Sequence, residues 1–99
     1  MPVDTGATVY MLRCRDCSYY VGVTRAGLEQ RVAQHDAGTF GGFTAGKRPV
    51  ELMFHQHFPD ITDAIAAERQ LKGWSRAKKD ALIAGDWNLV RALARGRSR

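Results

Sequence analysis

Two tyrosines, an arginine, a histidine and a glutamate are the residues of this sequence with the strongest potential for chemistry. Tyr10 and Tyr20 are ten positions apart, Arg31 and His35 are four apart, and Glu68 follows much later in the chain. Hydrolysis of a phosphodiester needs a base for the attacking water, a cation for the developing charge, and an acid or metal ion for the leaving group. These five side chains could supply each of those parts.

Each residue type suits one role in that reaction. A tyrosine acts as a base only where nearby positive charge lowers its pKa from about 10. An arginine fork matches the several oxygens of a pentavalent phosphate. A single carboxylate is enough to hold Mg²⁺, which takes its remaining ligands from water and phosphate. Each residue also has a plain structural alternative: the tyrosines can fill a sheet, the Arg31–His35 pair can flank a helix, and the glutamate can form an ion pair with Lys72, four residues on.

Length, composition and charge indicate one small basic domain. The chain has 99 residues, a formal charge of +5 and 44% hydrophobic residues, an ordinary share for a globular protein. The positive charge favours a polyanionic partner, nucleic acid first. The first ten residues lack a basic region followed by an apolar run, and no stretch reaches the roughly 20 apolar residues of a membrane span. We therefore expect a soluble, cytoplasmic protein with no membrane partner.

The scaffold that must position these residues begins with a predicted β-hairpin. Residues 7–14 and 18–24 are rich in β-branched and aromatic residues, and only "RDC" separates them. A loop of three residues usually needs the left-handed conformation, most often glycine, at its last position, where this chain has Cys17. Cys14 and Cys17 form a C-x-x-C pair, but no second ligand pair follows for zinc, so we interpret them as thiols near the hairpin end.

Loop length decides whether the two tyrosines meet. A three-residue loop pairs Leu12 with Tyr20 and Tyr10 with Gly22. The two tyrosines are then diagonal neighbours on one face, about 7–8 Å apart at the backbone. A two-residue loop would separate them, because a one-residue slip moves every side chain to the opposite face.

The rest of the sequence predicts one more strand and several helices. In chain order we expect a helix at 27–35, a glycine-rich loop at 37–49, a strand at 50–57, helices at 63–73 and 76–84, and a last helix carrying Trp87, Val90 and Leu93. The order β-β-α-β-α-α implies an α+β fold with helices packed on a small sheet. We expect an N-terminal extension at 1–6, one domain at 7–94 and a basic tail at 95–99.

Local signals place the ends of the later helices. Thr62 is the expected N-cap of the 63–73 helix and Ser75 that of the next helix, which Gly85 ends; Asp86 can cap the last one. Within the 63–73 helix, Glu68 falls in or beside the apolar stripe, where a solvated carboxylate is unusual.

Together these residues resemble the GIY-YIG nuclease superfamily. "TVY" at 8–10, ten residues before "YVG" at 20–22, is similar to its two-part signature. The likeness continues through R-x-x-x-H at Arg31 and His35, "KRPVEL" at 47–52 and "ERQLKGWSRAKKDALI" at 68–83. It spans roughly residues 7–87 and is greatest to the small stand-alone bacterial members. The resemblance implies a three-stranded antiparallel sheet flanked by helices, and metal-dependent cleavage of phosphodiesters.

The resemblance also implies a role for each candidate residue. Tyr10 and Tyr20 would be the signature tyrosines, one of them the general base, with the choice between them open. Arg31 would stabilise the transition state, and His35 would support it or relay a proton. Glu68 would bind one Mg²⁺ or Mn²⁺ ion.

Backbone access and phosphate contacts complete the expected site. Gly22 would allow a close backbone approach. Gly42, Phe43 and Ala45 stand where relatives often carry Lys, Tyr and Arg, and Asp36 follows His35 where Asn is usual. The expected nucleic-acid contacts are therefore the basic residues nearby and on the later helices: Lys47, Arg48, Arg69, Lys72, Arg76, Lys78 and Lys79.

Three functions compete on this sequence. The first is a metal-dependent endonuclease that selects DNA by structure or single-strandedness, since we expect no second domain to recognise sequence. The alternative is a non-catalytic nucleic-acid-binding module of the same fold, using its basic helices and the arginine tail. The third, a regulatory or oligomerising protein without a nucleic-acid partner, predicts weak binding that does not depend on salt. Glu68 favours the first, because a polyanion binder gains nothing from a carboxylate in its groove.

Overall fold

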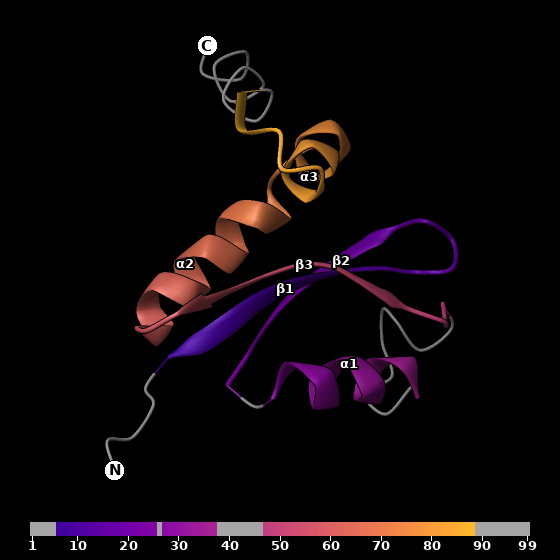
Figure 1. Cartoon of the computed structure of the whole chain (residues 1–99), viewed down its shortest axis with the longest axis horizontal. Helices are drawn as coiled ribbons and strands as arrows, with labels where there is room; N and C mark the ends of the chain where they lie inside the picture. Colours follow the sequence, from indigo (N-terminus) through magenta and orange to yellow (C-terminus); the bar gives the residue numbers. More distant parts are fainter. Residues whose placement is uncertain (1–5, 26, 38–46, 89–99) are drawn as a thin grey trace.

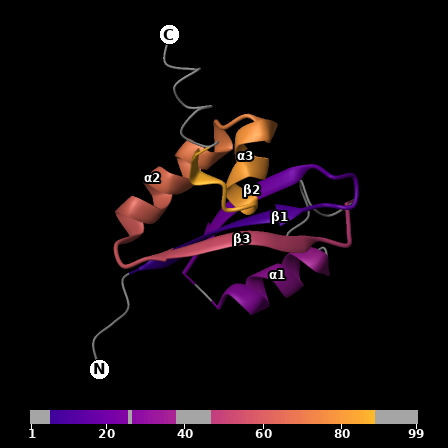
Figure 2. The same cartoon turned by 45° about the horizontal axis from the view of Figure 1, so that its top comes forward.

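A computed structural model of the protein describes residues 6–25, 27–37 and 47–88. Three strands, β1 (Ala7–Arg13), β2 (Tyr19–Thr24) and β3 (Glu51–Phe58), form an antiparallel sheet in the order β2-β1-β3. The helices are α1 (Leu28–Asp36), α2 (Ile61–Lys72) and α3 (Arg76–Ile83). Figures 1 and 2 show α1 on one face of the sheet and α2 with α3 on the other. The predicted α+β fold and its element order are confirmed.

The β1–β2 hairpin has the three-residue loop and the register that the sequence predicts. Leu12 pairs with Tyr20 and Tyr10 with Gly22. The Cys14 N–H donates to the Ser18 carbonyl at 2.9 Å to close the loop. Cys17 takes the left-handed conformation that glycine favours, with φ of 69°.

Asp16 stabilises this loop. Its Oδ1 accepts hydrogen bonds from the Ser18 N–H at 3.0 Å and the Ser18 hydroxyl at 2.6 Å. These bonds, aided by Lys47, lower the pKa of Asp16 to about 2. An Asp that bonds to the residue two positions on is a common turn device, and here it supports a loop without glycine.

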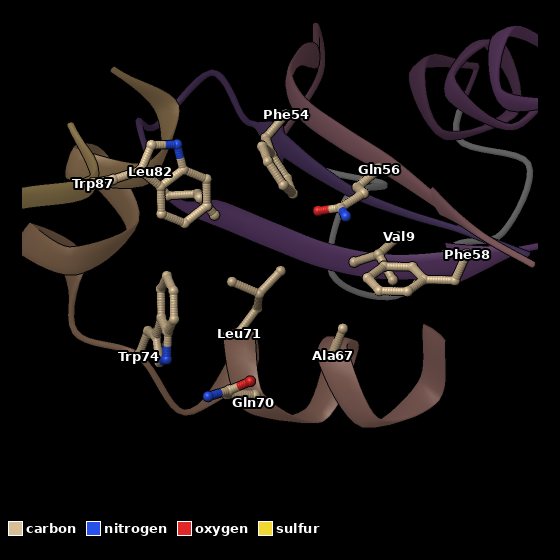
Figure 3. A pocket seen from close by; sticks show the side chains of 10 residues that line it. All are labelled: Val9, Phe54, Gln56, Phe58, Ala67, Gln70, Leu71, Trp74, Leu82 and Trp87. Atoms are coloured by element: carbon tan, nitrogen blue, oxygen red, sulfur yellow. The ribbon is translucent and has the colours of Figure 1, made fainter. Parts of the chain in front are cut away.

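The core lies between the sheet and the α2–α3 pair. Side chains alternate along a strand, so β1 sends Val9 and Met11 to this face and Tyr10 and Leu12 to the other. The buried cluster on this side comprises Ala7, Val9, Met11, Val21, Ala64, Leu71, Ala81 and Leu82. Beside it lies an apolar cavity of about 300 Å³, in which Phe54 and Phe58 of β3 face α2 and the two tryptophans (Figure 3).

The N-cap of α2 differs from the prediction. Asp60, not Thr62, precedes the helix, and its Oδ1 accepts from the Thr62 N–H at 2.8 Å. The carboxylate accepts a hydrogen bond from this N–H group and also places negative charge at the positive end of the helix. A threonine hydroxyl could accept the hydrogen bond but could not supply the charge. The helix therefore begins two residues earlier than expected.

The other helix ends follow the sequence more closely. Ser75 caps α3 as predicted, its hydroxyl accepting from the Lys78 N–H at 3.2 Å, and Gly85 with φ of 75° follows the helix. Helical conformation resumes at Trp87 and Asn88. Val90 and Leu93, expected on that last helix, lie outside the described residues, as does most of the expected 37–49 loop with Gly42, Phe43 and Ala45.

Candidate active site

Tyr10 is the centre of the candidate site. It points from the central strand to the α1 face and is only 2% exposed. Its phenol lies over the backbone of Gly22 on the neighbouring strand. A Cβ at position 22 would be 2.6 Å from both the Cζ and the hydroxyl oxygen of Tyr10, and 3.0 Å from Cε2 of Tyr20. The close approach expected at Gly22 is thus made by the protein's own Tyr10, which reaches across β2 towards the edge of the sheet.

His35 brings α1 into contact with both tyrosines. Its Nε2 and the Tyr10 hydroxyl are hydrogen-bonded at 2.9 Å, and the imidazole is buried, with 4% exposure. Ring centroids are 6.3 Å apart for Tyr10 and Tyr20, 5.9 Å for Tyr10 and His35, and 4.9 Å for Tyr20 and His35. The two tyrosines therefore share one face, as the register requires, and the histidine joins them there.

The electrostatics of this cluster keep both members of the hydrogen-bonded pair uncharged near neutral pH. Burial, and then the negative charges that Tyr20 and Glu68 can carry, raises the pKa of Tyr10 to about 12, while Arg31 opposes the rise. Burial, followed by the charge of Arg31, lowers the pKa of His35. Tyr10 is therefore a protonated phenol next to a neutral imidazole, and very little of it is present as the phenolate that a general base requires.

Arg31 is held beside the rings by the end of β2. Its Nε donates to the Thr24 hydroxyl at 3.2 Å, and Thr24 is itself buried. The guanidinium influences the pKa of both Tyr10 and His35, so its charge is directed at the same cluster. Arg31 and His35 lie four residues apart on one side of α1, which is why a single short helix delivers both.

Glu68 comes from α2, on the opposite face, yet its charge reaches the Tyr10 phenol and raises the pKa of that group. The Glu68 side chain is 14% exposed and forms an ion pair with Lys72, with Oε2 and Nζ 2.6 Å apart. The alternative expectation for Glu68, an ion pair with Lys72, is confirmed; its expected role as a metal ligand stays a prediction.

Glu68 is the residue that could hold a metal ion. Within the described ranges, no group of three or more His, Cys, Asp or Glu side chains is arranged to bind one. The described ranges therefore contain no site in which several protein side chains surround a metal ion, as a zinc site requires. A Mg²⁺ or Mn²⁺ ion bound through one carboxylate and completed by water and phosphate oxygens fits this donor set.

The basic residues after α1 attach the 47–50 segment to its surroundings. Lys47 Nζ lies 3.4 Å from the Asp16 carboxylate, and an Nη of Arg48 donates to the Ala37 carbonyl at 3.1 Å. Asp36 accepts a 2.9 Å hydrogen bond from the Val50 N–H. This role was not foreseen from the sequence, although an Asn side-chain oxygen could fill it equally well. These contacts connect the β1–β2 hairpin loop and the end of α1 to the segment that leads into β3.

Several of the predicted phosphate contacts on α3 are occupied within the protein. Arg76 stacks 3.9 Å over the ring of Tyr19, donates to the Cys17 carbonyl and lies 3.5 Å from Asp80. Lys78 is 6% exposed, with its ammonium 4.3 Å from the centre of the Trp74 ring. The prediction that Lys78 contacts phosphate is wrong, because docking of α3 buries its stem and sets the charge on an aromatic face.

The remaining basic positions on these helices are more accessible. Arg69 is exposed on α2, and Lys72 is exposed beside its glutamate partner. Lys79 is half-buried, and its burial, together with Arg76, lowers its pKa. None of the described helices is long and apolar enough to cross a membrane.

Known proteins are similar to this chain in sequence and in fold. The family model of the GIY-YIG catalytic domain matches residues 6–80. A UPF0213 protein of Natronomonas pharaonis is 42% identical over 78 residues, covering 79% of this chain and 91% of its own. A UPF0213 protein of Bacillus pumilus is 39% identical over 74 residues, which cover 75% of this chain and 74% of the relative. The solution NMR structure of a UPF0213 protein from Bacillus halodurans matches with a TM-score of 0.53 and 33% identity. The match covers 80% of this chain and 83% of the chain in that structure.

Proposed function

The chain belongs to the GIY-YIG family of nuclease domains, and on that premise we propose that it is a metal-dependent endonuclease that hydrolyses phosphodiester bonds of DNA. The main support is one observation: Tyr10 and His35, 25 residues apart in sequence, are hydrogen-bonded while the charges of Arg31 and Glu68 act on the same phenol. A sheet that only needed filling would have no use for a buried histidine bonded to the tyrosine and an arginine one helical turn away from that histidine.

Tyr20 is our candidate for the general base. Tyr10 is buried and its pKa is raised to about 12, so it keeps its proton. Tyr20 lies on the same face, with its ring centroid 4.9 Å from that of His35, and it is only half-buried, so it is more accessible to water than Tyr10. In this assignment Tyr10 and His35 act as a fixed pair that positions the Tyr20 ring, and Tyr20 takes the proton of the attacking water.

Arg31 and Glu68 supply the charges that the reaction needs. A guanidinium carries five N–H donors, of which one goes to Thr24, and its fork suits the oxygens of a pentavalent phosphate. Glu68 would hold the Mg²⁺ or Mn²⁺ ion, which supplies Lewis-acid stabilisation of phosphate charge when bound. Lys72 forms an ion pair with the Glu68 carboxylate, and this ion pair would have to break for the metal ion to bind there.

Selection of the substrate follows from what these groups recognise. A guanidinium, phenols and a metal ion address phosphate and water, and carry no information about base sequence. We therefore infer that DNA is chosen by shape or strandedness. Among the phosphate contacts predicted from the sequence, Lys47, Arg48, Arg69 and Lys72 are accessible to the DNA backbone.

A non-catalytic nucleic-acid-binding module is the second candidate. It is favoured by the ion pair that occupies Glu68, with its atoms 2.6 Å apart, and by the protonated state of Tyr10. In such a protein the carboxylate would serve only to orient Lys72 towards phosphate. The two candidates differ in whether the site binds a metal ion and cleaves.

Cleavage of single-stranded, duplex and branched DNA, with Mg²⁺ or Mn²⁺ and with chelator, tests the nuclease. Glu68→Gln removes the metal ligand at constant size, and we expect at least about 100-fold slower cleavage. Glu29→Gln, which removes an exposed acid from the first turn of α1, is the matched control. Equal cleavage by Glu68→Gln would reject the metal role. DNA binding by the wild type with no cleavage under any condition would favour the binding module.

A further inference from the structure

A second cavity lies on the Tyr10 face, beside the first residues of β1. It measures about 310 Å³, and its lining residues include Thr8, Thr24, Arg25, Gly27 and His57. It differs from the apolar cavity of Figure 3, which lies on the opposite face and is lined largely by aromatic and aliphatic groups. Its polar lining raises the question of what it binds.

The strand register sets this cavity one step away from the tyrosine site. Thr8 pairs with Thr24 on one side and His57 on the other, two residues along β1 from Tyr10. Residues two apart on a strand share a face and are separated by about 6.6 Å. The cavity and the Tyr10 phenol are therefore successive positions on one polar face.

Arg31 connects the two positions. Its Nε donates to the hydroxyl of Thr24, which lines the cavity, at 3.2 Å, while its charge acts on Tyr10 and His35. A phosphate held at Arg31 would thus have the cavity beside it. A second phosphate of the same backbone could enter that space.

The lining is suited to an anion. Among the described residues no Asp or Glu lines the cavity, and no carboxylate pairs with the exposed guanidinium of Arg25. The Thr8 hydroxyl and His57 Nδ1 are hydrogen-bonded to each other at 3.2 Å, which holds both side chains at the exposed lining of the cavity and leaves the second hydrogen-bonding capacity of the hydroxyl for a ligand. A guanidinium, a hydroxyl and an imidazole are groups that proteins use to bind phosphate oxygens.

We propose that this cavity binds a backbone phosphate of the nucleic acid, one step from the phosphate at Arg31. The proposal rests on the proposed function, because it assumes a nucleic-acid substrate. Arg25 provides the charge, and Thr8 with His57 provides hydrogen bonds. Anchoring a neighbouring phosphate fixes the register of the strand, so that the phosphate to be cut is held against Arg31 and the tyrosines.

The test is a binding scan that does not depend on cleavage. Short single-stranded oligonucleotides, each with one phosphate replaced by an uncharged methylphosphonate, are titrated into metal-free protein in chelator. We expect one position to weaken wild-type binding about fivefold or more, and Arg25→Ala to cause a similar loss on the unmodified strand. The same methylphosphonate should then have no further effect on Arg25→Ala, because both changes remove one contact.

Control variants show whether the coupling is specific. Arg15→Ala removes the same charge from the exposed hairpin loop, at the far end of β1, and should keep the full methylphosphonate effect. Thr8→Val and His57→Gln should reduce it at that one position. The slope of binding against salt should fall by roughly 0.7–1 in Arg25→Ala.

The outcomes separate this proposal from the nuclease proposal. If Arg25→Ala keeps every methylphosphonate effect of the wild type, the cavity does not bind phosphate, whatever the protein cleaves. If the wild type binds no oligonucleotide at all, the nucleic-acid function and the cavity proposal both fail. If the coupling is present but no DNA is ever cut, the cavity proposal holds and the nuclease proposal fails.

Discussion

The phenol of Tyr10 occupies the space that a side chain on Gly22 would need, with two of its atoms 2.6 Å from the position of the missing Cβ. The two residues are direct partners across β1 and β2. Gly22 of the second signature tripeptide therefore leaves the space that the ring of Tyr10, in the first tripeptide, occupies. This relationship links the two halves of the signature physically.

Gly22→Ala should disturb the site more than its size suggests. The methyl group would push the Tyr10 ring away from His35, and we expect a loss of about 1–3 kcal/mol in the free energy of unfolding together with loss of cleavage. Urea denaturation and a cleavage assay measure the two effects. Gly73→Ala, where the added Cβ would have no neighbour closer than 3.6 Å, is the control and should change both little. Equal behaviour of the two variants would contradict the close contact.

The two tyrosines should differ in their effect on rate. If Tyr20 is the base, Tyr20→Phe should lower the single-turnover cleavage rate by about 10²–10⁴-fold with little loss of stability. Tyr10→Phe should lower the rate less and stability more, by about 1–2 kcal/mol, because buried His35 loses its hydrogen-bond partner. The reverse order, with Tyr10→Phe the slower enzyme and still fully stable, would assign the base to Tyr10.

Stability should fall at both ends of the pH range because of the Tyr10–His35 pair. The pKa of His35 is lowered from 6.5, so below about pH 6.5 the unfolded chain binds a proton that the folded one excludes, and stability declines as pH falls. The pKa of Tyr10 is raised from 10.0 to about 12, so stability is full below pH 10 and declines as pH rises through 12. The alkaline loss should be on the order of 2 kcal/mol.

Urea titrations across this range identify the groups responsible. His35→Gln should flatten the acid side of the curve, and Tyr10→Phe should remove most of the alkaline decline. An unchanged alkaline decline in Tyr10→Phe would mean that another tyrosine causes it. Tyr19, whose pKa is raised by burial and by Asp80, is the one to examine through Tyr19→Phe.

The Glu68–Lys72 ion pair should compete with the metal ion. Lys72→Met removes the ammonium and keeps the stem, so the concentration of Mn²⁺ or Mg²⁺ that gives half-maximal cleavage should fall about two- to fivefold, the size expected for an exposed pair. Arg69→Met, on the same helix but without this contact, is the control for lost positive charge. A metal requirement that changes equally in both variants would show that Lys72 does not compete with the ion.

Features that depend on local spacing could be predicted from the sequence. The three-residue loop and the period of two along a strand were enough to set Tyr10 and Tyr20 on one face, and that register is confirmed. The Ser75 cap followed from a single residue at a helix start. Helical spacing predicted Glu68 in or beside the apolar stripe, and in α2 it lies four residues after buried Ala64 and three before buried Leu71.

Features that depend on how elements dock could not be predicted. Lys78 looked like a solvated cation, but its burial against Trp74 exists only once α3 packs on the sheet. The raised pKa of Tyr10 depends on burial under α1, which no spacing rule gives. Asp60 displaced Thr62 as the cap because either residue is a common N-cap, and only the path of the chain decides between them.

The two faces of the central strand β1 have different roles: Val9 and Met11 are buried in the core, and Tyr10 lies between them on the face of the candidate site. Substitutions in β1 that aim to raise thermal stability are therefore expected to disturb the candidate site as well. Repacking one flank would shift the backbone that aims the other. The outward side of α3, around exposed Ala77, offers room for improvement without that penalty.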